Sequence, residues 1–221
     1  MIVTLNPDLI KIVGLSLWVS LSAIVIATIL GVLLGTWLGL KSEKKTRFIN
    51  KLIFTLMGMP PVVAGLIIYL ILSRQGPLGV LGLLYTPGAM IIAQVFLALP
   101  IITGLTMVGI RARGKVIEET ARSLGADSRL AAWTVVKESR MAILGAVITG
   151  FGRVVAEVGA VMMVGGNIDG RTRVMTTAIV LETRKGNFEL AIGLGMILLS
   201  LSFFVNSVLY TIQKGGDAHE G

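Results

Sequence analysis

Residues 12–40 read IVGLSLWVSLSAIVIATILGVLLGTWLGL and contain neither a charged residue nor a histidine. A helix of about 20 apolar residues spans the hydrocarbon core of a bilayer, so this stretch is long enough to cross a membrane. Residues 52–73, 75–110 and 190–213 are also free of charge. Core helices of soluble proteins carry a polar face instead. The chain is therefore predicted to be an all-α membrane protein, a polytopic helical bundle.

The composition supports this prediction, since the chain is 54% hydrophobic, only 14% charged and has a mean hydropathy of +0.87. A fifth apolar run, residues 141–168, is interrupted only by Arg153 and Glu157. A sixth span stays open, because the apolar stretch 174–181 is too short to cross and would form a re-entrant or interfacial helix. We expect one transmembrane domain, residues 1–214, and a polar tail, 215–221. Its five predicted spans are about residues 10–40, 52–73, 88–110, 141–165 and 190–212.

Basic residues concentrate in two loops, and loops rich in Lys and Arg lie in the cytoplasm. Both loops are predicted to be cytoplasmic, which places the N-terminus outside the cell membrane and the C-terminus inside. The net charge of +8 then reflects orientation and does not indicate nucleic-acid binding. The basic residues of the two loops are Lys41, Lys44, Lys45, Arg47, Lys51, Arg111, Arg113, Lys115, Arg122, Arg129, Lys137 and Arg140.

Several kinds of chemistry have no support in the sequence. The chain has no cysteine, and its one histidine, His219, lies in the polar tail, so no metal site is predicted. It has no phosphate-binding loop of the GxxxxGK[ST] type and no nucleophile–base motif. We expect no cofactor, no ATP binding and no catalysis by this chain.

Prolines and glycines indicate how the helices bend and pack. Proline lacks a backbone donor and clashes with the preceding turn, so a kink or a break of the helix is predicted at Pro60 and Pro61 and at Pro100. Gly31, Gly35 and Gly39 recur at every fourth position and align on one helix face, which permits close approach of another backbone. Tight packing within the chain is a better explanation of this pattern than contact with a second copy.

The charged loop at residues 111–140 has a helix–turn–helix pattern. Glu118 and Arg122 form an i,i+4 pair in the favourable order. Gly125 is suited to end the first helix in the left-handed conformation. Asp127 or Ser128 is suited to cap the second. The charges alone favour an ordinary solvated loop.

Arg153 and Glu157 are four residues apart and are predicted to share one helix face. A charge in the bilayer costs roughly 2.5–3.5 kcal/mol on insertion scales unless it is paired or hydrated. The two residues are therefore either a helix anchor or part of a pathway.

Four stretches of the sequence together resemble one family. The loop ETARSLGAD, residues 119–127, resembles the Glu-Ala-Ala…Gly loop of ATP-binding cassette (ABC) importer permeases, although Thr120 replaces the middle alanine and Lys137-Glu138 stands where Leu-Pro is usual. RVVAEVGAVMMVGGNI (153–168), RTRVMTTAI (171–179) and MPPVVAG (59–65) are similar to permeases for molybdate, sulfate and tungstate, and most similar to those for tungstate.

The resemblance covers about residues 10–212 and implies a type I ABC importer permease fold. It implies a separate ATPase subunit, docked on a coupling helix through Glu119, Ala121, Gly125, Ala126 and Asp127. It also implies an extracytoplasmic substrate-binding protein and a permease homodimer in membrane lipid. A path for a tetrahedral dianion needs hydrogen-bond donors and a compensated cation. The candidate path residues are Arg153, Glu157, Gly159, Thr149, Thr176 and Thr177.

The predicted function is import of an oxyanion, tungstate in the first place, with molybdate or sulfate as the alternative within the family. A membrane enzyme or an assembly scaffold that uses Arg153 and Glu157 is the alternative from another class. Co-purification of an ATPase distinguishes the permease from both.

Overall fold

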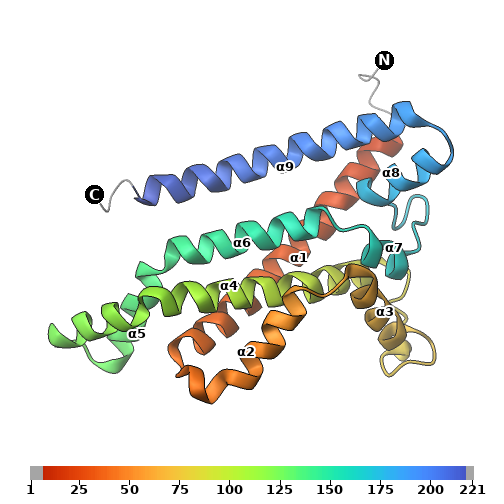
Figure 1. Cartoon of the computed structure of the whole chain (residues 1–221). Coiled ribbons are helices and arrows are strands. Elements are labelled where there is room, and N and C mark those ends of the chain that lie inside the picture. The colour runs from red at the N-terminus through yellow and green to blue at the C-terminus, as the bar shows by residue number, and fades with distance from the viewer. Residues whose placement is uncertain (1–6, 218–221) are drawn as a thin grey trace. The chain divides into compact units, whose positions relative to one another are not determined.

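The computed structural model describes residues 7–217, and this part of the chain is helical without any strand (Figure 1). The prediction of an all-α protein is confirmed. The elements are α1 (Pro7–Leu40), α2 (Glu43–Met57), α3 (Pro61–Leu72), η1 (Gly79–Leu81), α4 (Pro87–Ser123), α5 (Ser128–Glu138), α6 (Arg140–Val155), α7 (Gly159–Gly165), α8 (Met175–Arg184) and α9 (Phe188–Asp217).

Three helices are long and apolar enough to cross a membrane: α1, α4 and α9. Two further pairs qualify when each is counted as one bent span, α2 with α3 at 106° and α6 with α7 at 55°. The structure thus has three to five candidate spans, and the number five stays a prediction. The predicted polar tail begins inside α9, and residues 218–221, including His219, lie outside the described part.

The prolines behave differently at the two predicted breaks. Pro60 and Pro61 lie at the bend between α2 and α3. Pro61 is the first residue of α3, a position whose backbone N–H makes no hydrogen bond within the helix, so a proline is tolerated there. The break predicted at Pro100 is wrong, because α4 runs through this residue without interruption, and a kink there stays a prediction. One proline removes a single hydrogen bond of the helix, and the residues that follow it, Ile101 and Ile102, are buried by packing.

Contacts divide the chain into two compact units, each assembled from three segments. The helices α1, α4, α6 and α9 contribute residues to both. Unit 1 is Met1–Val25, Met59–Leu97 and Gly152–Val205, and unit 2 is Ile26–Gly58, Ala98–Phe151 and Asn206–Gly221.

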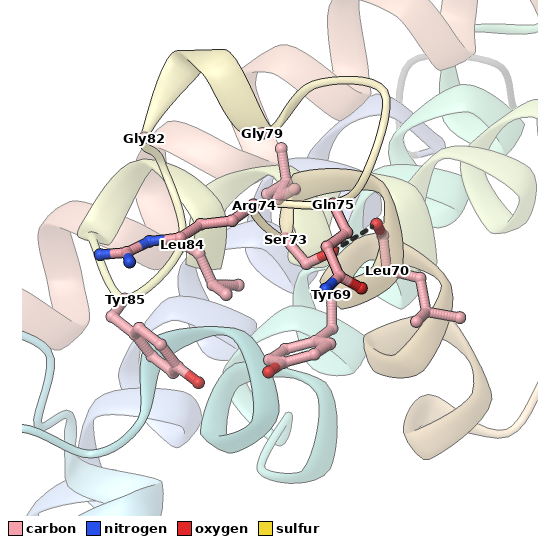
Figure 2. Close-up of a pocket in the computed structure, with 10 residues that line it drawn as sticks. Tyr69, Leu70, Ser73, Arg74, Gln75, Gly79, Gly82, Leu84 and Tyr85 are labelled. Carbon is pink, nitrogen blue, oxygen red and sulfur yellow. Dashed lines mark hydrogen bonds between the residues drawn. The ribbon is translucent and has the colours of Figure 1, made fainter.

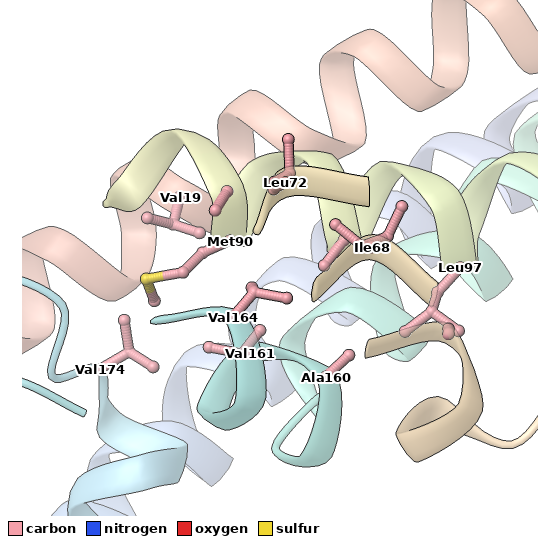
Figure 3. Packing of buried hydrophobic residues seen from close by; sticks show 12 residues of the cluster. Val19, Ile68, Leu72, Met90, Leu97, Ala160, Val161, Val164 and Val174 are labelled. Carbon is pink, nitrogen blue, oxygen red and sulfur yellow. The ribbon is translucent and has the colours of Figure 1, made fainter. Parts of the chain in front are cut away.

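The core of unit 1 brings α3, α4 and α7 together with the first half of α1. Figure 3 shows side chains of this cluster from three helices: Ile68 and Leu72 of α3, Met90 of α4, and Val161 and Val164 of α7. A second cluster packs α8 on α9 and α1 through Met175, Ala178 and Leu194. These contacts place the short helices α7 and α8 against the long ones.

The glycine stripe of α1 packs inside unit 2. A Cβ atom at Gly35 would lie 2.6 Å from the carbonyl oxygen of Thr103 and 2.7 Å from Cβ of Thr106. Added Cβ atoms at Gly31 and Gly39 would likewise meet α4 side chains within 3 Å. The predicted packing within the chain is confirmed.

Replacing Gly35 by leucine is expected to destabilise the protein, because no space exists between α1 and the backbone of α4. Overpacking of this kind costs about 1–3 kcal/mol. Thermal unfolding of the detergent-solubilised protein would measure the loss. Gly14→Leu is the matched control on the same helix, since an added Cβ at Gly14 meets nothing within 4 Å. Equal unfolding temperatures for the two variants would contradict the close packing.

Candidate functional site

Two helix breaks meet in unit 1. The guanidinium of Arg153, near the end of α6, donates to the carbonyl oxygen of Met59 at 3.4 Å. An added Cβ at Gly159, the first residue of α7, would lie 3.2 Å from Cγ2 of Val62 on α3. A Cβ atom added at Gly65 of α3 would lie 2.7 Å from Cα of Ala160 on α7. The gap between α6 and α7 therefore lies directly against the gap between α2 and α3.

Glu157 occupies the break between α6 and α7 and does not share a helix face with Arg153. That prediction is wrong because α6 ends at Val155 and α7 begins at Gly159. The Glu157 carboxylate, 3% exposed, accepts a hydrogen bond from the Ala160 N–H at 2.8 Å. It thus satisfies a free donor in the first turn of α7. No ion pair joins Glu157 to Arg153 in the described residues.

The three threonines predicted for the path lie in different surroundings. The buried Thr176 hydroxyl donates to the carbonyl oxygen of Glu157 at 2.9 Å, so α8 is tied to the break. The Thr177 hydroxyl bonds the N–H and the carbonyl oxygen of Val174 and caps its own helix. Thr149 is exposed on α6 in unit 2, and its hydroxyl donates to the Gly145 carbonyl oxygen. Arg153, Glu157, Gly159 and Thr176 therefore form the cluster at the break.

Gln94 of α4 is a member of this region that the sequence interpretation missed. Its side chain is 4% exposed, and its amide donates to the carbonyl oxygen of Val154 at 3.3 Å. This carbonyl lies at the end of α6, where the helix supplies no donor. The Oε1 atom of Gln94 has no hydrogen-bond partner among the residues that the structure describes. The available indication in the sequence was an amide in the apolar part of the uncharged run 75–110.

The coupling loop predicted at residues 119–127 forms a Schellman turn. The Ala126 N–H donates to Ala121 O at 3.0 Å and the Gly125 N–H to Arg122 O at 3.0 Å, with Gly125 at φ 87°. The Asp127 side chain caps α5 by accepting from the Leu130 N–H at 2.8 Å. The first helix of the loop is the end of α4 and not a separate helix. The expected i,i+4 pair is present, with Arg122 2.8 Å from Glu118.

The two helices of this loop leave apolar side chains uncovered in unit 2. Leu124 at the turn is 84% exposed and Trp133 of α5 is 65% exposed, and Val116 and Leu130 are also exposed. α5 returns along α4, where a Cβ at Gly114 would lie 3.2 Å from Cγ1 of Val135 (Figure 1). Exposed apolar residues grouped around a charged turn are typical of a protein-docking surface.

Arg111 fixes the base of this loop. Its guanidinium donates to the Leu38 carbonyl oxygen at the end of α1 and to the Thr46 hydroxyl of α2, both at 2.9 Å. α1, α2 and α4 are thereby tied together within unit 2, at the point where α4 continues into the coupling loop.

Comparison with known proteins matches residues 31–215 to the family described as "Binding-protein-dependent transport system inner membrane component". The chain is 41% identical to the "Tungstate uptake system permease protein TupB" of Peptoclostridium acidaminophilum, over 97% of this chain and 94% of the relative. It is 40% identical to the "Probable anion ABC transporter permease protein" of Haloferax volcanii, over 90% of this chain and 88% of the relative.

Among solved structures, the chain resembles the "Crystal structure of an amino acid ABC transporter with histidines". The TM-score is 0.64 at 16% identity, covering 96% of this chain and 94% of the other. This likeness shows the type I importer permease fold. With several apolar helices and a family match over most of its length, the chain belongs to the binding-protein-dependent transport system inner membrane components and is a multi-pass ABC importer permease.

Proposed function

We propose that this permease imports tungstate, taking it from an extracytoplasmic binding protein into the cytoplasm. The observation that carries the proposal is the 41% identity to a tungstate uptake permease over nearly the whole of both chains. Molybdate and tungstate are tetrahedral dianions of nearly equal size. Because tight binding in the permease would slow release, we assign most of the selection between them to the binding protein. The permease needs only a path that suits such an anion.

The cluster at the helix breaks is the proposed path. Arg153 supplies positive charge. The negative charge of Glu157 weakens the attraction between Arg153 and a dianion. Gly159 leaves room beside α3, and the Thr176 hydroxyl is a further donor. Kinked and broken helices beside a substrate path recur in transporters, because the rest of the protein satisfies the freed backbone groups. Weak binding at this place allows release.

We assign ATP hydrolysis to a separate ATPase subunit and no catalysis to this chain. The turn from Glu119 to Asp127, including Ala121, Gly125 and Ala126, docks in that subunit. The exposed Leu124 and Trp133 supply apolar contact area to the same surface. ATP-driven closure of the ATPase subunits moves the turns as rigid bodies and switches access between the two membrane sides.

Two copies of the permease line the path in this proposal, with residues 1–214 of each forming one transmembrane domain of five spans. The N-terminus lies outside and the C-terminus in the cytoplasm, in agreement with the basic residues of loops 41–51 and 111–140. Membrane lipid covers exposed apolar side chains of α9 such as Leu199, Phe203 and Phe204.

Uptake into proteoliposomes that contain the permease, its ATPase and its binding protein tests the function. We expect ATP-dependent accumulation of labelled tungstate that resists competition by equimolar molybdate and sulfate. Equal inhibition by molybdate would leave an oxyanion importer without tungstate preference. Absence of uptake for all three anions by a stably assembled transporter would contradict the proposal.

A further inference from the structure

A cavity of about 600 Å³ lies beside the loop between α3 and α4, apart from the cluster at the helix breaks (Figure 2). Its volume falls in the range of small-molecule sites, about 300–1,000 Å³. Tyr69 of α3 and Tyr85 at the end of the loop contribute their rings, and Ser73, Arg74 and Gln75 contribute polar groups. The cavity belongs entirely to unit 1.

The loop that shapes this cavity is held in place by its own backbone. A Cβ atom at Gly76 would overlap the carbonyl oxygens of Leu70 and Ile71, so the chain turns back tightly on α3. The Leu78 N–H donates to Ile71 O at 3.0 Å. At the other end, the Tyr85 N–H donates to Val164 O of α7 at 2.9 Å. The walls are therefore organised before any ligand arrives.

Tyr85 has an unusual conformation, with φ at 62°. Bulky residues rarely adopt this left-handed region, and such strain, of order 1–3 kcal/mol, concentrates at functional sites. The Tyr85 ring meets the Tyr69 ring edge to face, with centroids 6.5 Å apart. A hydrogen bond with Tyr69, assisted by burial, raises the pKa of the Tyr85 phenol above its ordinary value.

Arg74 brings an uncompensated positive charge to the cavity. In the described part of the chain, no acidic residue lines this cavity. The Arg74 side chain has no ion pair or hydrogen bond within residues 7–217. Figure 2 shows it extending across the cavity wall towards the segment that carries Tyr85. A guanidinium binds oxyanions through charge and paired N–H donors, so the cavity is suited to such a ligand.

We propose that this cavity receives a small tetrahedral oxyanion in hydrated form, with Arg74 as its counter-ion. The inference rests on the proposed function and adds a first contact site before the helix breaks, on the extracytoplasmic side in the proposed orientation. The apolar side chains of Leu70 and Leu84 in the lining limit the affinity, which lets the anion move on. A lipid phosphate shares the same chemistry and is the other possible source of an oxyanion.

Equilibrium dialysis of labelled tungstate tests the site directly. The probe is the permease–ATPase complex without binding protein, in nanodiscs of neutral phosphatidylcholine. We expect Arg74→Gln to weaken tungstate binding about tenfold, as loss of a charge-assisted contact does. The matched control Arg184→Gln removes another exposed arginine, on α8 of the same unit, and should bind as the wild type does. Equal binding by all three proteins would overturn the proposal.

Two further measurements distinguish tungstate from a lipid headgroup as the ligand, and the proposed site from the proposed transport function. If wild-type protein binds no tungstate in neutral nanodiscs but retains anionic lipid that Arg74→Gln loses, the ligand is a headgroup and the proposal is overturned. Wild-type uptake in proteoliposomes is measured independently. A tenfold loss of binding in Arg74→Gln without any wild-type uptake would support the site and contradict the transport function. Normal uptake with unchanged Arg74→Gln binding would overturn only the site.

Discussion

Arg153→Gln is expected to lower oxyanion uptake about 10- to 100-fold while the transporter remains folded and assembled. The guanidinium supplies charge at the meeting point of the two helix breaks, and a hydrogen bond to a charged group contributes about 1.5–3 kcal/mol. Without it, a dianion faces the buried carboxylate of Glu157. Labelled-tungstate uptake measures the effect, and Arg153→Lys, which keeps the charge, should retain more activity. Full uptake by Arg153→Gln would assign Arg153 to helix anchoring.

Substitutions of Glu157 provide the control that separates charge from fold. Glu157→Gln keeps an oxygen to accept from the Ala160 N–H, whereas Glu157→Ala leaves this donor at the start of α7 unpaired. Loss of such a cap costs about 0.5–2 kcal/mol. Only the alanine variant should unfold at lower temperature. If both variants assemble and transport normally, the cluster at the break has no role in the pathway.

Gly125→Val is expected to abolish uptake by preventing association with the ATPase subunit. Gly125 has φ 87°, and a β-branched residue in the left-handed region costs about 1–2 kcal/mol. An added Cβ there meets nothing within 4 Å, so any effect arises from the backbone turn and not from a clash inside the permease. The measurement is the amount of ATPase that co-purifies, together with uptake.

Gly125→Asn is the matched variant, because asparagine adopts the left-handed conformation more readily than valine does. It should retain the Schellman turn and a larger share of bound ATPase. Protease resistance of each variant alone verifies that α4 and α5 remain folded. Normal docking by Gly125→Val would contradict the assignment of this turn to the ATPase interface.

The positions of the helices and the form of the coupling turn were predictable, since both depend on neighbouring residues. Uncharged runs predicted the apolar helices, and Gly125 and Asp127 predicted the turn and the cap of α5. At Pro100, local sequence predicted a helix break that the structure does not have. A proline shows where one backbone hydrogen bond is lost, but packing around Ile101 and Ile102 decides whether the helix ends.

The candidate sites depend on partners that are distant in the chain. Glu157 leaves the expected helix face because α6 stops at Val155, and its carbonyl oxygen meets Thr176 of α8. Gln94 was overlooked because its partner, Val154, is 60 residues away. The cavity at Arg74 exists because the loop after α3 turns back and is tied to α7.

By itself, the sequence determined that this protein is a helical membrane protein with a charged helix–turn–helix loop, because apolar length, turn residues and caps act over a few neighbouring positions. Only the tertiary structure decided which polar groups meet. Broken helices expose backbone donors and acceptors, and in an apolar environment these must be satisfied by whichever side chains packing brings near. That choice of partners places Arg153, Glu157 and Thr176 together and leaves Arg74 without a counter-ion among residues 7–217.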